Sequence, residues 1–540
     1  MSGLLPVLLR QRLRRDRIQL LLWILGTGAL ALSGQSGVAE SYGTPQDRQT
    51  LVALALANPV ILVFRGLPSG TSEGAFLAFL LLPWLAILAA LMSVFLAVRH
   101  TRGDEDAGRT ELLSSTPAGR TLPTLATLVH GVAANAALGL ASAGALAIGD
   151  LEVDGALLCG AAAAATGVVF LGAGLLAAQV MPTARGANSL AVWVLLGTFL
   201  LAGLSNAVGT PSSDLSRMDS AWPVWLSPFG WAEQTRPFDA DRWWPLALSV
   251  ACALVLSLGA LALQSTRDVG ASLVAARDGR ATARRGLSSP SALTWRLAAG
   301  SVLGWAAGGA VVGILATTLG RLVDQIAGQN TAVEHILERI AGAGALEEAV
   351  VTTFFTFLGI LAACSAVQTV VRARQAEVHG TAEPVLSTPT GRARWLAGYL
   401  AVATGAVLIV VAAALAAAYL GLAASGGAES LYRVVTVAGL GQVVAASVFT
   451  VLAALAFVLV PRATLGVAWG LVLVATVLGM FGPLLGLPEW TADLSPFAQS
   501  PVTVGGEVDV RGLWWLLAVV AAGSAAALVL MRRRELAGAG

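Results

Sequence analysis

Long apolar runs alternate with short polar segments along the whole chain. Twelve of these runs reach about 20 residues, which is the length an α-helix needs to cross roughly 30 Å of hydrocarbon. They lack the roughly 10-residue alternation of a transmembrane β-barrel, so helices are the expected form. The pattern predicts an all-α polytopic membrane protein with spans near residues 18–38, 75–98, 122–148, 155–180, 188–208, 243–264, 297–319, 349–371, 395–421, 433–460, 465–487 and 512–531.

A polar segment between the second and third spans recurs between the eighth and ninth. Residues 102–120 and 374–392 align without a gap, and nine of their nineteen positions are identical. We call them the first and second repeated segments. Because each is a short loop that connects two spans, each is expected to lie at the membrane surface. The identical pairs are Arg102/Arg374, Glu105/Glu377, Gly108/Gly380, Glu111/Glu383, Ser115/Ser387, Thr116/Thr388, Pro117/Pro389, Gly119/Gly391 and Arg120/Arg392.

Other matches at similar offsets indicate an internal duplication. Arg14 and Trp23 correspond to Arg296 and Trp305, and Leu-Ser-Pro-Phe at 226–229 recurs at 494–497. An even number of spans in each copy gives both copies the same orientation. The predicted organisation is two parallel six-span halves, residues 1–264 and 295–540, joined by a polar linker, residues 265–294.

The basic residues set the predicted orientation. Hydrophobic residues make up 56% of the chain and charged residues 12%, and all 33 basic residues are arginine. With both termini in the cytoplasm, 24 arginines fall on cytoplasmic segments and 9 on the other side, as the positive-inside rule requires. We therefore expect a multi-pass plasma-membrane protein with cytoplasmic termini and cytoplasmic repeated segments. Since the chain has no lysine, it cannot itself carry a Walker A ATPase site.

Three segments outside the spans have their own patterns. Residues 4–17 mix apolar side chains with five arginines, which is typical either of an interfacial helix or of a disordered topological signal. Residues 51–64 are apolar but too short to span and are interrupted by Asn58-Pro59, so we expect them to lie on the outer face. Residues 320–348 are the expected counterpart in the second half.

The segments between spans five and six and between spans eleven and twelve, together with the first residues of spans six and twelve, hold eight of the 15 tryptophans. They are interpreted either as an aromatic belt at the membrane interface or as two broken re-entrant helices that form an outer gate. The gate residues would be Leu226, Ser227, Pro228 and Phe229, with Leu494, Ser495, Pro496 and Phe497 in the second half.

Polar groups inside the predicted spans are few. A charge at the bilayer centre costs roughly 2.5–3.5 kcal/mol on insertion scales, and the cores of the predicted spans hold no Asp, Glu or Arg. His130 is expected to be a hydrogen-bonded packing residue, and the four histidines appear scattered, so neither a catalytic nor a metal site is predicted. Energy for transport should therefore enter through the cytoplasmic loops. Other polar side chains in the span cores include Asn135, Gln179, Asn206, Gln368 and Gln442.

The second repeated segment resembles the loop motif between the second and third spans of type V ATP-binding-cassette (ABC) exporters. The motif residues are Glu377, Gly380, Thr381, Glu383, Thr388 and Pro389, with Pro384 where leucine is usual. The first segment repeats the motif in Glu105, Gly108, Glu111, Thr116 and Pro117, with Arg109 where threonine is usual. The whole chain is similar in particular to the actinobacterial exporters of polyketide antibiotics.

This resemblance implies a permease that moves a small lipophilic or amphipathic drug. No nucleic acid is expected among its partners. Two copies of a separate ABC ATPase would carry ATP and Mg, so no cofactor is expected on this chain. Two alternatives stay open: an ion-coupled secondary drug carrier with twelve spans, which would need an intramembrane carboxylate, and a membrane-embedded lipid-handling enzyme, which would need a converging set of histidine and carboxylates.

Within the first repeated segment, residues 105–113 favour a short surface helix, and Thr116-Pro117 should end it. Gly119 permits a tight exit, and Arg120 begins the next span. Carboxylates on such a helix could pair with arginine on the ATPase. The segments differ in charge, since the first also carries Asp104 and Asp106, so Glu105 and Glu377 are expected to matter unequally. The predicted ATPase-coupling residues are Glu105, Gly108, Glu111, Thr116, Pro117, Gly119, Arg120, Glu377, Gly380, Thr381, Glu383, Thr388, Pro389, Gly391 and Arg392.

Overall fold

The structure is a computed structural model, and the part it describes is almost entirely helical. Within that part, twelve helices are long and apolar enough to span a membrane, and each overlaps one of the predicted runs. The predicted all-α, polytopic fold is thereby confirmed. The described residues are 4–57, 59–114, 119, 121–149, 151–268, 270–274, 282, 287, 289–327, 345–425, 429–481, 488–504 and 507–535.

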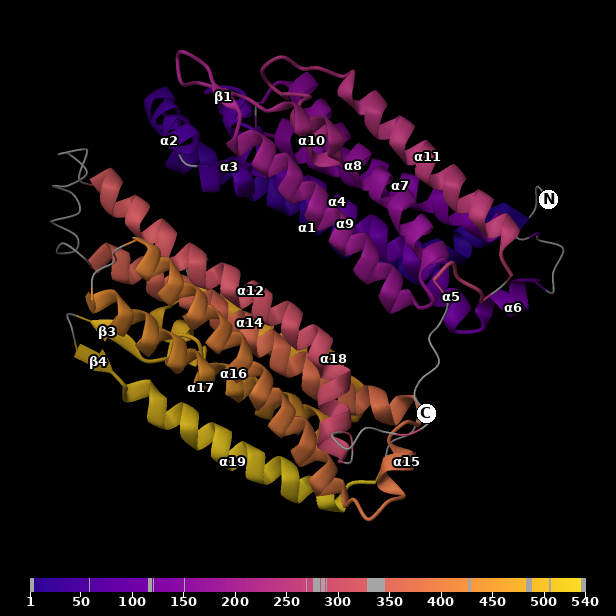
Figure 1. The fold of residues 1–540 in the computed structure, drawn as a ribbon, viewed down its shortest axis with the longest axis vertical. Coiled ribbons are helices and arrows are strands. Elements are labelled where there is room, and N and C mark those ends of the chain that lie inside the picture. The colour runs from indigo at the N-terminus through magenta and orange to yellow at the C-terminus, as the bar shows by residue number, and fades with distance from the viewer. Residues whose placement is uncertain are drawn as a thin grey trace. The chain divides into compact units, whose positions relative to one another are not determined.

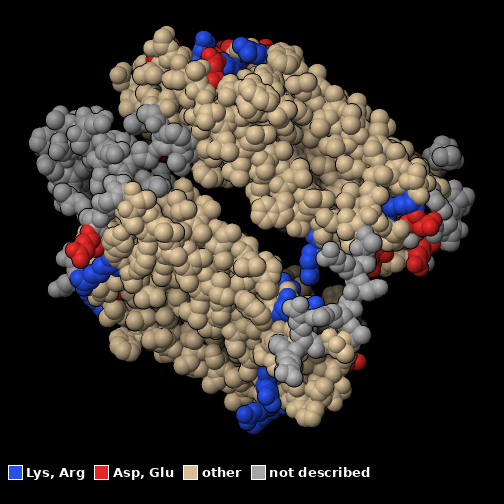
Figure 2. Space-filling model, in the orientation of Figure 1, with Lys and Arg blue, Asp and Glu red and all other residues tan. Residues whose placement is uncertain are grey.

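The chain forms two compact units, Met1–Gly279 (unit 1) and Arg280–Gly540 (unit 2). The division falls inside the predicted linker. Figure 1 shows each unit as a bundle of long helices with short elements at its two ends. On the face visible in Figure 2, charged side chains gather mainly near the ends of the bundles, and the surface between is largely uncharged, as lipid contact requires.

In unit 1, α8 lies at the centre and packs against α4, α7 and α11. Small residues let helices approach closely: a Cβ on Gly139 would lie 2.7 Å from the carbonyl oxygen of Gly160. Thr210 pairs with Asp219 in the antiparallel β1–β2 hairpin. The elements are α1 (Leu4–Ser41), α2 (Pro45–Ala57), α3 (Pro59–Arg65), α4 (Glu73–Arg99), α5 (Arg102–Asp106), α6 (Arg109–Ser114), α7 (Leu122–Ala147), α8 (Val153–Val180), α9 (Ala184–Ala207), β1 (Thr210–Pro211), β2 (Met218–Asp219), η1 (Trp222–Leu226), α10 (Pro228–Glu233) and α11 (Pro245–Thr266).

In unit 2, α14 packs against α12, α16 and α17. A Cβ on Gly313 would lie 2.2 Å from the carbonyl oxygen of Ala414, so α12 and α16 are held as close as α7 and α8. Val502 pairs with Asp509 in the antiparallel β3–β4 hairpin. The elements are α12 (Pro290–Ala327), α14 (Ala345–Val378), α15 (Glu383–Leu386), α16 (Arg392–Ser425), α17 (Glu429–Leu459), η3 (Pro461–Ala463), α18 (Thr464–Thr476), η4 (Val477–Phe481), η6 (Glu489–Leu494), β3 (Val502–Val504), β4 (Glu507–Asp509) and α19 (Arg511–Arg533).

The N-terminal segment differs from both of its predicted forms. Residues 4–17 are the first turns of one continuous helix, α1, which also includes the first span. Its buried face carries Leu8, Arg12, Asp16 and Leu20, which are four residues apart and therefore lie on one side of the helix. A charged pair thus enters the interior of unit 1, and the segment is neither a separate interfacial helix nor disordered.

The apolar residues 51–64 form α2 and α3, with the break at the expected Asn58-Pro59. Leu62 is fully buried and α3 packs against α9, so this element belongs to the bundle and does not simply lie on its surface. Most of its predicted counterpart, residues 320–348, lies outside the described residues.

Candidate coupling segments

The first repeated segment forms two short helices, α5 and α6, at one end of unit 1 (Figure 1). The single helix predicted for residues 105–113 is wrong. Gly108 has a φ of 69°, a left-handed conformation that glycine adopts without the steric cost of a Cβ, and it turns the chain between the two helices. Gly119 has a φ of 68°, which fits the expected tight exit. Thr116, Pro117 and Arg120 lie outside the described residues.

The second repeated segment makes the same turn on a different support. Here the preceding membrane helix, α14, continues without a break to Val378. Gly380 then turns the chain with a φ of 69°, matching Gly108. The short helix α15 follows and ends two residues before Thr388-Pro389, and α16 begins at Arg392. Thr381 and Gly391 are exposed.

Glu105 is held inside unit 1 by two arginines, a group we call the first clamp. Arg102 donates a hydrogen bond from Nη1 to Glu105 Oε2 (2.5 Å) and from Nε to the carbonyl oxygen of Met181 (2.8 Å). Arg267, directly after α11, donates from Nη2 to Glu105 Oε1 (2.5 Å) and from Nε to Gln179 Oε1 (2.6 Å). The carboxylate thus ties the repeated segment to the end of the sixth span.

Glu377 is held in the same way in unit 2, by the second clamp. Its Oε2 lies 3.2 Å from Arg374 Nη1 and 2.8 Å from Arg534 Nη2. Arg534 directly follows α19, the last span of the unit, and its guanidinium stacks 4.4 Å from the ring centroid of Phe457. Arg392 adds a hydrogen bond from Nη1 to the carbonyl oxygen of Arg534 (2.6 Å), so both ends of the segment meet the end of α19.

The two clamps divide the predicted coupling carboxylates into two kinds. The side chains of Glu105 and Glu377 are 9% and 1% exposed, and their oxygens face arginines of the same chain. Glu111 and Glu383 are exposed. Among these four carboxylates, Glu111 and Glu383 are therefore on the surface, while Glu105 and Glu377 hold the segments to their own unit.

Sequence reasoning missed Arg267 and Arg534, although a signal for them was present. Each is the first residue after the sixth span of its half, and each is followed by an acidic residue, Asp268 or Glu535. The two pairs stand 267 positions apart, close to the offset of the repeated segments. A search for matched charges at span ends would have found them.

The extra acidic residues of the first segment have partners within unit 1. Asp104 Oδ1 lies 2.8 Å from both Arg15 Nη1 and Arg109 Nη1. Asp106 Oδ2 accepts a hydrogen bond from the backbone N–H of Ala184 (2.8 Å), at the start of α9, where a helix favours a negative charge. The first segment is therefore attached to α1, α9 and α11.

Comparison with known proteins agrees with this duplicated arrangement. Residues 9–263 and 287–532 match a family model described as Multidrug efflux system permease Rv1217c, C-terminal domain. The chain is 36% identical over 516 residues to Multidrug efflux system permease protein Rv1217c of Mycobacterium tuberculosis (strain ATCC 25618 / H37Rv), covering 94% of this chain and 91% of that protein. The chain belongs to this permease family. The resemblance to ABC-type drug-export permeases is thereby confirmed.

The Leu-Ser-Pro-Phe segments of this permease agree in burial at three of their four positions, and they differ at the proline, which is buried at Pro228 and half-buried at Pro496. Leu226 and Leu494 are exposed, while the serine and phenylalanine that follow are buried. Ser227 caps α10, with its Oγ accepting from the N–H of Phe229 (3.2 Å), whereas the residues after Ser495 form turns. Both segments lie between candidate spans. Six of the eight nearby tryptophans are exposed: Trp222, Trp243, Trp244, Trp490, Trp514 and Trp515.

A buried carboxyl, Glu233, ends α10 at the opposite end of unit 1 from α5 (Figure 1). Burial raises the pKa of Glu233 to about 7, against a hydrogen bond from Asn206 Nδ2 (2.7 Å) that lowers it. Nearby, a hydrogen bond from Arg236 lowers the pKa of Asp219. Glu233 is a functional candidate that the sequence did not indicate, because no counterpart occurs in the second half.

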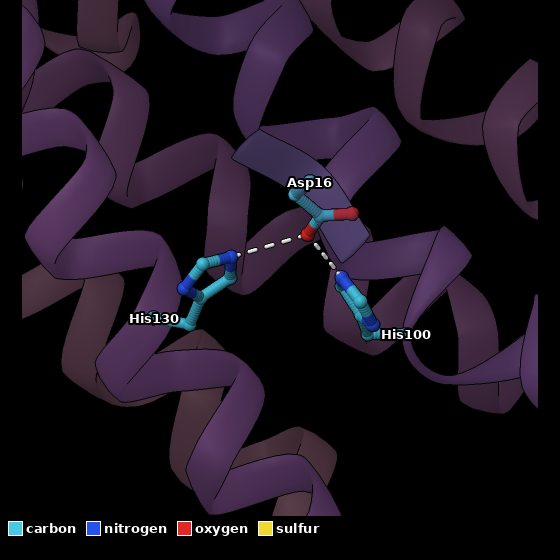
Figure 3. A group of neighbouring side chains, drawn as sticks. All are labelled: Asp16, His100 and His130. Atoms are coloured by element: carbon cyan, nitrogen blue, oxygen red, sulfur yellow. Dashed lines mark hydrogen bonds and ion pairs between the residues drawn. The ribbon is translucent and has the colours of Figure 1, made fainter. Parts of the chain in front are cut away.

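The expectation that the histidines are scattered is wrong for two of the four. His100 and His130 converge on the carboxylate of Asp16 (Figure 3). His130 is hydrogen-bonded, as expected. Its partner is Asp16, an acidic residue that lies outside the predicted first span. Asp16 was missed because it stands among five arginines, two residues before the predicted start of the first span.

An apolar cavity of about 520 Å³ lies between α1 and α4 of the permease. Ligand pockets commonly have volumes of about 300–1,000 Å³. The lining is apolar except for Arg65, so the cavity suits a lipophilic molecule with a hydrogen-bond acceptor. Its lining residues are Leu30, Gly34, Val38, Arg65, Leu77, Leu80, Leu81, Trp84, Ile87 and Leu88.

Proposed function

We propose that this chain is the membrane-spanning permease of an ATP-driven exporter, located in the plasma membrane with both termini in the cytoplasm. Two copies of a separate ABC ATPase, carrying ATP and Mg, would dock on the two repeated segments. The observation that supports this proposal most is the duplicated clamp. Each of the two polar segments is fixed by a buried carboxylate to the last span of its unit. This arrangement is expected if an ATPase subunit exerts force on the permease at each of the two segments.

The clamps provide the path by which such a push reaches the membrane helices. A charge-assisted hydrogen bond is roughly twice as strong as a neutral one, so Glu105 and Glu377 bind each segment tightly to its sixth span. Displacement of α6 or α15 by the ATPase would then move α11 or α19 as well. Glu111 and Glu383 would be the contacts to the partner, through arginines on its surface.

The cargo would be a lipophilic or amphipathic compound. The related protein is named a multidrug efflux permease, and the cavity between α1 and α4 offers apolar walls with one arginine. Transport of a sugar or a small ion would need several polar groups along the path, and the candidate spans have few.

One observation favours the alternative that the chain is an ion-coupled carrier: Asp16 is buried together with two histidines. Coupling sites of secondary transporters lie near the bilayer midplane and between repeats. This cluster lies at the end of unit 1 that carries the repeated segment, since His100 directly follows α4 and Thr101 precedes α5. Of the corresponding positions in the second half, Ala298 and Val402 are apolar and Arg372 is basic, so none of them provides a carboxylate or an imidazole. A proton path across the membrane is therefore poorly supported.

Co-purification with an ABC ATPase tests the proposal. The purified complex should contain two ATPase subunits for each permease, and a lipophilic substrate should stimulate hydrolysis. The double substitution Glu111→Arg with Glu383→Arg should abolish stimulation, because it reverses the charge of both exposed contacts. Asp214→Arg, at an exposed position between β1 and β2, should leave stimulation unchanged. Full stimulation in the double variant would refute the assigned docking surface.

A further inference from the structure

Three polar side chains from three different helices meet inside unit 1 (Figure 3). Asp16 comes from α1, His100 stands at the end of α4 and His130 comes from α7. The Nε2 atoms of both imidazoles face Asp16 Oδ2: His100 is hydrogen-bonded to it, and His130 lies 3.1 Å away. All three residues are buried, with 3%, 3% and 6% of their surfaces exposed.

The arrangement leaves the polar atoms incompletely satisfied. Two imidazole nitrogens share a single carboxylate oxygen, while Asp16 Oδ1 has no hydrogen-bond partner in the described part of the chain. The Arg99 guanidinium lies 3.3 Å from Oδ1 in an ion pair, and that side chain is a third exposed. Buried polar atoms normally have partners, so the cluster is suited to a further ligand that uses both nitrogens and the carboxylate.

A divalent transition-metal ion fits this set of donors. Two neutral imidazoles and one carboxylate are common ligands of zinc and of related first-row metals, whereas Mg²⁺ and Ca²⁺ prefer oxygen alone. The three ligand atoms lie within 4.8 Å of one another. Tetrahedral zinc with bonds of roughly 2.0 Å would separate its ligands by about 3.3 Å, so small side-chain rotations would close the site.

The surroundings include a second carboxylate. His100 Nδ1 lies 3.9 Å from Asp104 Oδ2, and a carboxylate on the far nitrogen is the usual support of a metal-binding histidine. The buried Arg12 points away, donating hydrogen bonds to Thr127 Oγ1 (2.6 Å) and the carbonyl oxygen of Pro123 (2.7 Å). A cavity of about 200 Å³ borders His100 and Asp104, and its lining also includes Arg12, Arg15 and Arg109.

We propose that Asp16, His100 and His130 form a binding site for one divalent transition-metal ion, with Zn²⁺ as the ion to test. The bound ion would join α1, α4 and α7 at the point where α4 leads into α5. The matching positions in the second half are Ala298, Arg372 and Val402, so this set of ligands does not recur at the matching place in unit 2. If the proposed function holds, occupancy would restrain the first repeated segment alone.

Metal binding is measured on the purified permease without an ATPase, so its outcome is independent of the proposed function. The chain is prepared with an affinity tag free of histidine, stripped with chelator and titrated with Zn²⁺ by calorimetry and with Co²⁺ by absorption spectroscopy. One equivalent should bind at pH 7.5, and binding should be lost at pH 5.5, because protonated histidine does not ligate. The Co²⁺ complex should show visible bands of nitrogen and oxygen ligation.

Substitutions assign the ion to these residues. His130→Ala and Asp16→Asn should abolish stoichiometric binding. His379→Ala, at an exposed position in unit 2, should leave it unchanged. Asp104→Asn removes the supporting carboxylate, together with its ion pairs to Arg15 and Arg109, but leaves all three ligands in place. It should weaken binding by about tenfold, which keeps the test valid if a buried substitution prevents folding. Absence of a bound equivalent in folded wild-type protein, or its retention in folded His130→Ala protein, would overturn the assignment.

Discussion

The two units have one charged group in common, the carboxylate clamp, and they differ in a second, the buried cluster around Asp16. The comparison separates a feature that both halves contain from one that occurs in a single half. Both have a carboxylate clamp between a repeated segment and the last span: Glu105 with Arg267, and Glu377 with Arg534. Only unit 1 has the Asp16–His100–His130 cluster. In unit 2, Ala298, Val302, Val402 and Ala406 pack there as an apolar cluster.

This difference indicates that the clamp serves a task that both halves perform, whereas the histidine cluster does not. An apolar cluster fills the space in unit 2 without the desolvation cost of buried charges, so packing alone does not require Asp16. The clamps also differ in detail. Glu105 has one arginine on each oxygen, whereas both arginines of Glu377 contact Oε2, and its Oε1 is buried without a hydrogen bond in the described part of the chain.

The largest effect is expected from breaking the second clamp. Arg534→Leu removes the closer partner of a carboxylate that is 1% exposed, and loss of one member of a buried ion pair typically costs about 3–5 kcal/mol. The thermal unfolding midpoint of the purified permease in detergent should fall sharply. Arg533→Leu, at the exposed neighbouring position, is the matched control, and equal midpoints for the two variants would show that the clamp is not a stabilising contact.

The next effect is a pH dependence that only unit 1 should contribute, because Pro501 stands where unit 1 has Glu233. The pKa of Glu233 is raised from 4.5 to about 7, so between these values the folded state holds a proton that the unfolded chain has lost. Stability should therefore fall as pH rises through this window, by at most about 3 kcal/mol at 1.36 kcal/mol per unit. Unfolding midpoints from pH 4.5 to 8 measure the slope.

Glu233→Gln should remove that slope while other titrating groups stay in place. A variant that keeps the wild-type profile would assign the pH dependence elsewhere. Asp219→Asn, at the exposed partner of Arg236, is a useful comparison because the pKa of Asp219 is lowered and its effect should have the opposite sign.

A smaller effect is expected from breaking the first clamp. Arg267→Leu leaves Glu105 with Arg102 at 2.5 Å, a closer remaining partner than Arg374 is for Glu377. The loss should approach that of one hydrogen bond to a charged group, about 1.5–3 kcal/mol. Midpoints measured alongside Arg534→Leu give the ranking, which a larger loss in Arg267→Leu would reverse.

The smallest effect is expected at the exposed carboxylates. Glu111→Gln and Glu383→Gln change surface positions, and such substitutions usually alter stability by less than about 0.5 kcal/mol. Their unfolding midpoints should match the wild type, even where stimulation of the ATPase is reduced. A large destabilisation would place these residues with Glu105 and Glu377 as internal supports.

Much of the fold could be predicted because lipid imposes a simple rule on sequence. The twelve spans follow from their length and hydropathy, and the duplication follows from the repeated segments. Matched charges at span ends mark Arg267 and Arg534, but their pairing in the clamps could not be predicted in the same way, because Glu105 and Arg267 lie more than 160 positions apart and no local pattern joins them. The break at Gly108 was missed because the helix-forming residues around it outweighed a single glycine.

Asp16 shows a second limit. A buried charge is excluded from a span only when it has no partner, and Asp16 has two histidines and Arg99. The two histidines stand 30 positions apart in the sequence, His100 at the end of α4 and His130 inside the next membrane span, α7. The packing of α1 against α7 is therefore needed to reveal the cluster.

The most direct test of how this permease is powered is transport by the purified chain in sealed vesicles, with and without the proposed ABC ATPase. The account predicts that a lipophilic fluorescent substrate moves only when the ATPase and MgATP are both present, and that an imposed pH gradient has no effect by itself. Movement of the substrate on a pH gradient, by the chain alone and without nucleotide, would contradict it.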